Sequence, residues 1–216
     1  MITLRLPNAL ALVVLVAAAA LPPGRARGQA SAAGPAHDRS GVVLAVNPAY
    51  FVIGGYGVKA GYDFPSGWSV FAVGQRIGEV PDGSVESFFE GADGIEVEWD
   101  YALGVEGWYR FDRERRSSPY LIASLGYEGW EVTARGGGGA SDYVHNAYAS
   151  LGAGYRWFPF ERHGLFLSAH YNVIVLLNNT DERRAGEAAY ALREVIPGLI
   201  PSPEIGWRVT LPSLGR

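Results

Sequence analysis

Apolar and polar residues alternate from Ile95 to Phe111, and this is the clearest pattern in the chain. Because successive side chains of a strand point to opposite faces, the alternation predicts a strand with one apolar and one charged face. The apolar set is Ile95, Val97, Trp99, Tyr101, Leu103, Val105, Gly107, Tyr109 and Phe111, and the polar set is Glu96, Glu98, Asp100, Ala102, Gly104, Glu106, Trp108 and Arg110. Such a long strand is typical of a sandwich or of the wall of a barrel.

The same reading predicts an all-β chain of about eight strands, an even number that suits a closed barrel. The other strands are expected at Val42–Asn47, Tyr56–Phe64, Trp68–Gln75, Tyr120–Val132, Val144–Phe158, Leu165–Val175 and Glu204–Leu211. Short connections at Pro65–Gly67, Asp112–Ser118 and Glu161–Gly164 alternate with long ones at Arg76–Gly94, Thr133–Tyr143 and Asn178–Pro203. This rhythm predicts an antiparallel up-and-down membrane β-barrel with its turns on one side and its loops on the other.

The last of the long loops is predicted to contain a short amphipathic helix over residues 181–195. Thr180 or Asp181 can cap its N-terminus. The apolar residues that follow at helical spacing are Ala188, Ala189, Leu192 and Val195. Beyond the N-terminal region, no apolar run is as long as a membrane-spanning helix, so any spanning structure must consist of strands.

The alternation alone leaves open which face of the barrel points inward. A secreted, lipocalin-like carrier of small molecules holds its apolar face inside, whereas a membrane barrel turns that face toward lipid. Glycines on the polar face favour the membrane barrel, since a narrow lumen needs small residues beside large ones. They are Gly57, Gly61, Gly104, Gly126, Gly152, Gly154 and Gly206. Aromatic residues near the strand ends of the apolar face resemble interfacial girdles.

The ends of the chain differ in composition from the predicted barrel. Residues 1–30 have a basic residue, an apolar run and small residues before Ala30, which predicts a cleaved secretory signal peptide. A flexible leader over 31–40, the barrel over 41–211 and a C-terminal tail over 212–216 complete the domain plan. Cleavage would remove three of the 18 Lys and Arg residues and none of the 22 Asp and Glu residues. The resulting acidic balance argues against nucleic-acid binding.

Two segments resemble the small bacterial outer-membrane barrels of the OmpA-like and OmpW-like group. The stretch from Val46 through Gly54-Gly55-Tyr56-Gly57-Val58 and on to Tyr62 looks like their entry strand, and Glu204–Leu211 looks like their terminal assembly signal. In that group the signal ends in an aromatic residue, whereas here it ends in Leu211 and five residues follow. The resemblance implies export to the outer membrane, insertion by the barrel assembly machinery, contact with outer-membrane lipid, and a monomeric state.

The polar faces of the strands predict a network of charges inside the lumen. Charges confined in a narrow lumen must pair or stay hydrated. The expected members are Lys59, Glu96, Glu98, Asp100, Glu106, Arg110, Glu128, Arg156, His170, Glu204 and Arg208. A calcium site on the acidic column from Glu96 to Asp100 is the alternative, but same-face neighbours on a strand lie about 7 Å apart, too far for tight coordination. No metal or other cofactor is expected.

Ser168 and His170 are the candidate catalytic residues. Outer-membrane lipid A deacylases are similar barrels that use Ser, His and an acid. In those enzymes the His precedes the Ser and both face lipid, whereas here Ser168 precedes His170 and both are expected in the lumen. We therefore expect no enzymatic activity, with a lipid A-modifying hydrolase as the alternative. The expected role is structural or adhesive through the loops, because a barrel this narrow is no general pore.

Overall fold

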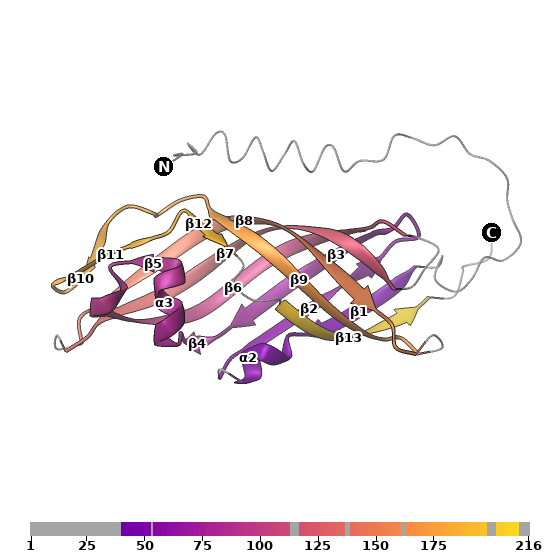
Figure 1. The fold of residues 1–216 in the computed structure, drawn as a ribbon, viewed down its shortest axis with the longest axis horizontal. Helices are drawn as coiled ribbons and strands as arrows, with labels where there is room; N and C mark the ends of the chain where they lie inside the picture. The colour runs from indigo at the N-terminus through magenta and orange to yellow at the C-terminus, as the bar shows by residue number, and fades with distance from the viewer. Residues whose placement is uncertain are drawn as a thin grey trace, which may run out of the picture.

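The structure is a computed structural model that describes residues 40–52, 54–112, 117–136, 139–160, 163–197 and 202–211. Its strands form a closed antiparallel barrel of eight, because the last strand pairs with the first (Figure 1). In ring order they are β1 (Gly41–Val46), β2 (Tyr56–Asp63), β3 (Trp68–Arg76), β6 (Ile95–Arg110), β7 (Ser118–Ala134), β8 (Ser141–Trp157), β9 (Leu165–Leu176) and β13 (Ser202–Thr210). The predicted all-β barrel is confirmed. The predicted signal peptide and C-terminal tail lie outside the described residues.

The barrel wall is taller on one side than on the other. Strands β6, β7 and β8 have 16 or 17 residues, whereas β1, β2, β3 and β13 have 6 to 9. The segments between the strands pack on the part of the long strands that rises above the short ones. There β4 (Gly78–Glu79) pairs with β6, and β12 (Val195–Pro197) pairs with β9. We call this the loop end of the barrel, and the opposite end, with Pro65–Gly67, the turn end (Figure 1).

The predicted helix over residues 181–195 is wrong. This segment contains a β-hairpin of β10 (Arg183–Ala185) and β11 (Ala188–Leu192), and β11 also pairs with β5 (Phe89–Glu90). Tyr190 and Leu192 are both buried, two residues apart on one face of a strand, and Gly186 supplies the positive φ of the tight turn. The helices described are α2 (Pro48–Val52), α3 (Asp82–Phe88) and the 3₁₀ turn η2 (Ala92–Gly94). In the described part of the chain, no helix is long and apolar enough to cross a membrane.

A β-bulge in β6 reverses the direction of its side chains. The pairing of β6 with β7 shifts between Trp99 and Tyr101, so that Asp100 is an extra residue. Below the bulge, Leu103 and Val105 are exposed and Glu106 is buried, as the sequence predicts. Above it the assignment is inverted, because Ile95, Val97 and Trp99 are buried and the acids between them are not.

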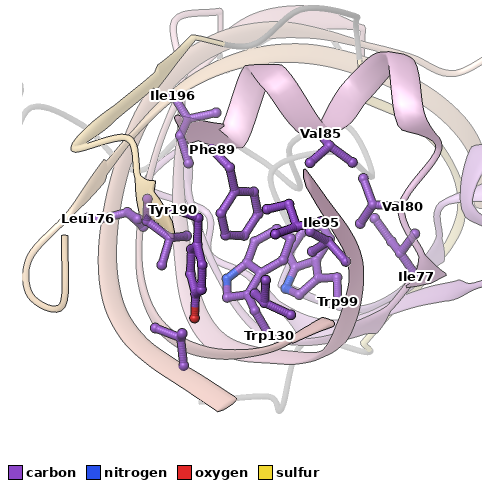
Figure 2. Close-up of a cluster of buried hydrophobic side chains, with 14 of the residues drawn as sticks. Ile77, Val80, Val85, Phe89, Ile95, Trp99, Trp130, Leu176, Tyr190 and Ile196 are labelled. Atoms are coloured by element: carbon purple, nitrogen blue, oxygen red, sulfur yellow. The ribbon is translucent and has the colours of Figure 1, made fainter. Parts of the chain in front are cut away.

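The buried residues above the bulge form an apolar cluster at the loop end. The long strands contribute Ile95, Trp99 and Trp130, and the two indole rings stack with centroids 5.0 Å apart (Figure 2). The segments between strands cover them with Ile77, Val80, Val85, Phe89, Tyr190, Leu192 and Ile196. We call residues 77–94 and 183–197 the loop cap. Apolar side chains therefore face inward at the loop end and outward below it.

Candidate functional site: the lumen and its apolar belt

The outward face of the eight strands below the loop cap is a continuous apolar surface, here called the apolar belt. It comprises the outward positions of 42–46, 56–64, 68–74, 101–109, 119–127, 147–157, 165–175 and 203–209, none of which is charged. Large apolar side chains here are exposed, such as Leu44 at 59%, Leu103 at 60% and Val105 at 59%. A contiguous apolar surface of this extent marks an interaction with lipid or protein.

The width of the apolar belt matches a bilayer. On β8 the belt runs from Ala147 to Trp157, a strand length of about 33 Å at ~3.3 Å per residue. A tilt of about 40° reduces this to a height of about 25 Å, the usual height of the apolar band of membrane barrels. Exposed aromatic residues, Trp157, Phe64 and Trp207 among them, lie at its turn end. Glu131, Thr133 and Ser141 continue the outer face above the belt and are polar.

Inside the belt, the turn end of the lumen is closed by an ion cluster around Asp63. Its carboxylate has no exposed surface and accepts hydrogen bonds from Arg156 Nη1 at 3.0 Å and from Arg208 Nε at 2.8 Å. Ser69 Oγ donates a third bond, at 2.5 Å. The Arg156 guanidinium also lies over the ring of Trp108, at 4.5 Å from its centroid. Asp63 was missed as a site residue, although the alternation of β2 places it on the same face as Lys59.

A second ion cluster lies further toward the loop end. Lys59 Nζ contacts both Glu106 and Glu204, the latter at 2.5 Å, and Trp108 Nε1 donates to Glu106 at 2.6 Å. The Trp108 ring stacks on Tyr120 with centroids 4.1 Å apart. All five side chains are buried. Together the two clusters fill the part of the lumen nearest the turn end.

The structure places most of the predicted lumen charges inside the barrel, but not all of them. Buried on the inner face are Lys59, Glu106, Arg110, Glu128, Arg156, His170, Glu204 and Arg208. Glu96 and Glu98 are exposed on the outer face above the belt, because the bulge reverses β6. Asp100, at the bulge itself, accepts a hydrogen bond from Tyr143 and lies 3.5 Å from Arg76 Nη2. Assigning these three acids to the lumen was wrong.

Ser168 and His170 lie in the lumen, but their contacts differ from those of a catalytic triad. Ser168 Oγ donates to Glu204 Oε2 at 2.9 Å, and His170 Nδ1 lies 3.2 Å from the Tyr120 hydroxyl. A Ser nucleophile requires a base that accepts its proton and an open approach to substrate. Here Ser168 is bound to a carboxylate that is itself paired with Lys59. This arrangement suits a lumen hydrogen-bond network.

Between the ion clusters and the loop cap, the lumen holds a cavity of about 460 Å³. Its floor includes Lys59, Glu106 and Glu204, and its wall includes Glu128 and Asn172. Most of the remaining lining is apolar or aromatic, including Val73, Ile77, Phe88, Trp99, Tyr148, Ile174 and Ile196. Among the described residues, no group of three or more His, Asp or Glu side chains could hold a metal ion.

Helix α2 places Tyr50 at the mouth of this cavity. Its ring lies over Gly57, where an added Cβ would lie 2.6 Å from the ring, so the glycine makes the position possible. Burial raises the pKa of the Tyr50 hydroxyl, and the nearby Tyr148 hydroxyl and three carboxylates raise it further. Those carboxylates are Glu204, Glu106 and Glu128. The acids of three different strands therefore converge on one cavity.

The loop cap is fixed to the barrel wall by a bidentate ion pair. Arg183 Nε and Nη2 donate to the two carboxylate oxygens of Asp142 at 2.8 and 2.9 Å, and the Tyr190 hydroxyl donates to Asp142 at 2.6 Å. These hydrogen bonds, that from Arg183 first, lower the pKa of Asp142. A guanidinium that donates two N–H groups to one carboxylate makes one of the stronger polar contacts found on protein surfaces.

We expect the β10–β11 hairpin to loosen when this ion pair is removed. The pKa of Asp142 is lower in the folded protein than the ordinary Asp value of about 3.9. The stability that ionised Asp142 gives the hairpin is therefore complete above this ordinary value, and it is lost as the pH falls through the lowered folded pKa. Arg183→Ala should destabilise the hairpin by about 1 kcal/mol at pH 7 and weaken this acid dependence, of which the Tyr190 hydrogen bond keeps a part. Hydrogen exchange of the β11 amides measures both effects. Arg184→Ala is the control, since Arg184 is exposed; an equal effect there would contradict the assignment.

Comparison with known proteins identifies no family. No family model and no curated protein matches the chain. Among solved structures, the chain is similar to Neisserial surface protein A (NspA), with 16% identity over 80% of this chain and 95% of that one, at a TM-score of 0.43. It is also similar to Ail, the attachment invasion locus protein of Yersinia pestis in complex with the heparin analogue sucrose octasulfate, with 15% identity over 79% and 98% of the chains and a TM-score of 0.39. At such values no property of either protein is carried over to this chain.

Proposed function

We propose that the protein is an integral outer-membrane β-barrel with a closed lumen, which presents its loop cap at the cell surface. The apolar belt carries this proposal. Removing apolar surface from water stabilises a protein by about 25 cal/mol for each Å². In water, the exposed Leu, Val, Tyr and Trp side chains of the eight strands would lack this stabilisation. In a bilayer the same surface is solvated by lipid, and all backbone groups of a closed barrel pair with one another.

The reversal of side-chain direction at the bulge supports the same proposal. Above Asp100 the barrel has an apolar interior and a charged exterior, as water-soluble proteins do. Below it, the exterior is apolar and the interior holds paired charges. One strand, β6, changes from one arrangement to the other within two residues, which is expected where a barrel leaves the bilayer.

The filled lumen favours a function at the cell surface over a function as a general pore. Trp108, Tyr120 and Phe166 are fully buried at the level of the ion clusters, where they occupy the interior together with Arg156. The interior of an eight-stranded barrel is filled by side chains or holds one small ligand, and it is too narrow for an aqueous channel. The loop cap packs on the barrel through its own hydrophobic cluster and the Arg183–Asp142 ion pair, and its outer surface is the one available to partners.

Membrane localisation and the closed lumen can be tested with the full-length protein. Expressed in a bacterium with an outer membrane, it should be recovered in the outer-membrane fraction and should change its mobility on SDS gels after boiling. Purified and inserted into planar bilayers, it should give no steady single-channel conductance. Recovery in the soluble periplasm would contradict the membrane proposal, and stable conductance steps would contradict the closed lumen.

A further inference from the structure

Glu128 is a buried carboxylate on the wall of the lumen cavity with no charged partner. Its side chain is 3% exposed, and its Oε1 atom has no hydrogen-bond partner. No ion pair described in the lumen involves it. Its counterparts differ, because Asp63 binds two arginines and both Glu106 and Glu204 bind Lys59. Burying a charge without a partner costs several kcal/mol, so Glu128 stays ionised only where a positive group pairs with it.

The charges that line the cavity are unbalanced toward the negative. Among the described residues of the lining, Lys59 is the one Lys or Arg, and it faces three acids, Glu106, Glu128 and Glu204. The arginines of the lumen lie toward the turn end, where Arg156 and Arg208 bind Asp63. With all three acids ionised, the lining keeps an excess of negative charge even when His170 is protonated. The cavity therefore favours a positively charged occupant.

The hydrogen-bonding groups of the lining indicate which kind of positively charged molecule the cavity suits. Asn172 also lines the cavity, and its Oδ1 atom has no partner, so Glu128 and Asn172 each have one acceptor that no described donor satisfies. An ammonium group has three N–H donors and one positive charge, and thus matches them. The apolar and aromatic remainder of the lining matches a hydrocarbon or aromatic body. A volume of about 460 Å³ lies within the usual range of small-molecule pockets.

We propose that the lumen cavity binds a small organic amine, with its ammonium group paired with Glu128 and its apolar body packed against Trp99 and Tyr148. The molecule enters from the loop end, where Ala49, Pro81 and Ser202 line the cavity and are exposed or half-buried. This site is independent of the surface role proposed above, because it depends on the lumen alone. Binding of the amine supplies the positive charge that the cavity lacks.

Calorimetry on the full-length barrel in lipid nanodiscs tests the proposal, with empty nanodiscs as the blank. The probe is 2-phenylethylamine at pH 7.5, and 2-phenylethanol and 3-phenylpropanoate are matched controls that differ in the charge of the head group. The amine should bind at least about 10-fold more tightly than the alcohol, as expected for a hydrogen bond to a charged group, and the carboxylate should bind more weakly still. Equal affinity for amine and alcohol, or no binding, would overturn the proposal.

Two variants locate the site. Glu128→Gln should remove the preference for the amine while leaving the affinity for 2-phenylethanol within about twofold, and Glu98→Gln, on the outer face, should change neither. Ala49→Trp at the mouth should weaken the binding of both compounds, and it serves as the deciding variant if Glu128→Gln fails to show the heat-dependent gel shift. An unchanged preference in Glu128→Gln, or unchanged binding in Ala49→Trp, would exclude this cavity. Either result leaves membrane insertion untouched.

Discussion

Replacing Asp63 by Ala should destabilise the barrel more than any other single change inside the lumen. Asp63 is completely buried and accepts hydrogen bonds from Arg156, Arg208 and Ser69. Without it, two buried guanidinium groups each lose a hydrogen-bonded carboxylate. Breaking a buried ion pair by removing one partner costs about 3–5 kcal/mol, chiefly because the remaining charge stays desolvated. That loss is a large share of the stability of a small domain, which is about 5–15 kcal/mol.

Urea unfolding of the variant in detergent or lipid, followed by tryptophan fluorescence and by the gel shift, measures this loss. Asp100→Ala is the matched control, since it also removes an Asp, at a position where the side chain is 37% exposed. It should cost less than about 1 kcal/mol, as surface ion pairs do. Similar unfolding midpoints for the two variants would show that the ion cluster at the turn end does not hold the barrel together.

Introducing an arginine into the apolar belt is the second change with a large expected effect. Val105 is 59% exposed and lies midway between Tyr101 and Tyr109 on the outward face of β6. A basic residue on the lipid face near the bilayer midplane costs about 2–4 kcal/mol in membrane barrels. Val105→Arg should therefore reduce insertion into vesicles and lower the free energy of unfolding by this amount.

Glu98→Arg provides the comparison on the same strand. Glu98 is exposed on the outer face above the bulge, where the surface is in water if the belt is in lipid. The same side chain should cost less than about 0.5 kcal/mol there, as substitutions at exposed surface positions usually do. If Val105→Arg proved as well tolerated as Glu98→Arg, the apolar belt could not face a bilayer.

Much of the fold could be predicted because alternation is a property of neighbouring residues. The pattern of β8, in which Tyr155 and Trp157 alternate with Gly154 and Arg156, is interrupted by no bulge, and the exposures of these residues follow it. In β6 the same reasoning succeeded from Leu103 to Arg110 and failed before Asp100. A bulge adds one residue to a strand without an obvious sequence signal, and each such residue reverses all assignments beyond it.

The loop cap was the part that the sequence predicted least well. Ala188, Ala189, Leu192 and Val195 have helical spacing, but the pairing of β11 with β5 decides the structure. β5 lies about one hundred residues earlier in the chain, and no local pattern specifies such a contact. The lumen site could likewise be predicted only in part from the sequence. The sequence placed Glu128 inside the barrel, but only the structure shows that Lys59 binds the other acids and not this one.

Single spin labels test directly whether the apolar belt lies in a bilayer and ends at the bulge of β6. The chain has no cysteine, so one label can be attached at Val105→Cys and another at Glu98→Cys without other changes. In lipid vesicles, the label at position 105 should be relaxed strongly by oxygen and weakly by a water-soluble nickel complex. The label at position 98 should show the reverse. Equal access of the nickel complex to both positions would contradict the account.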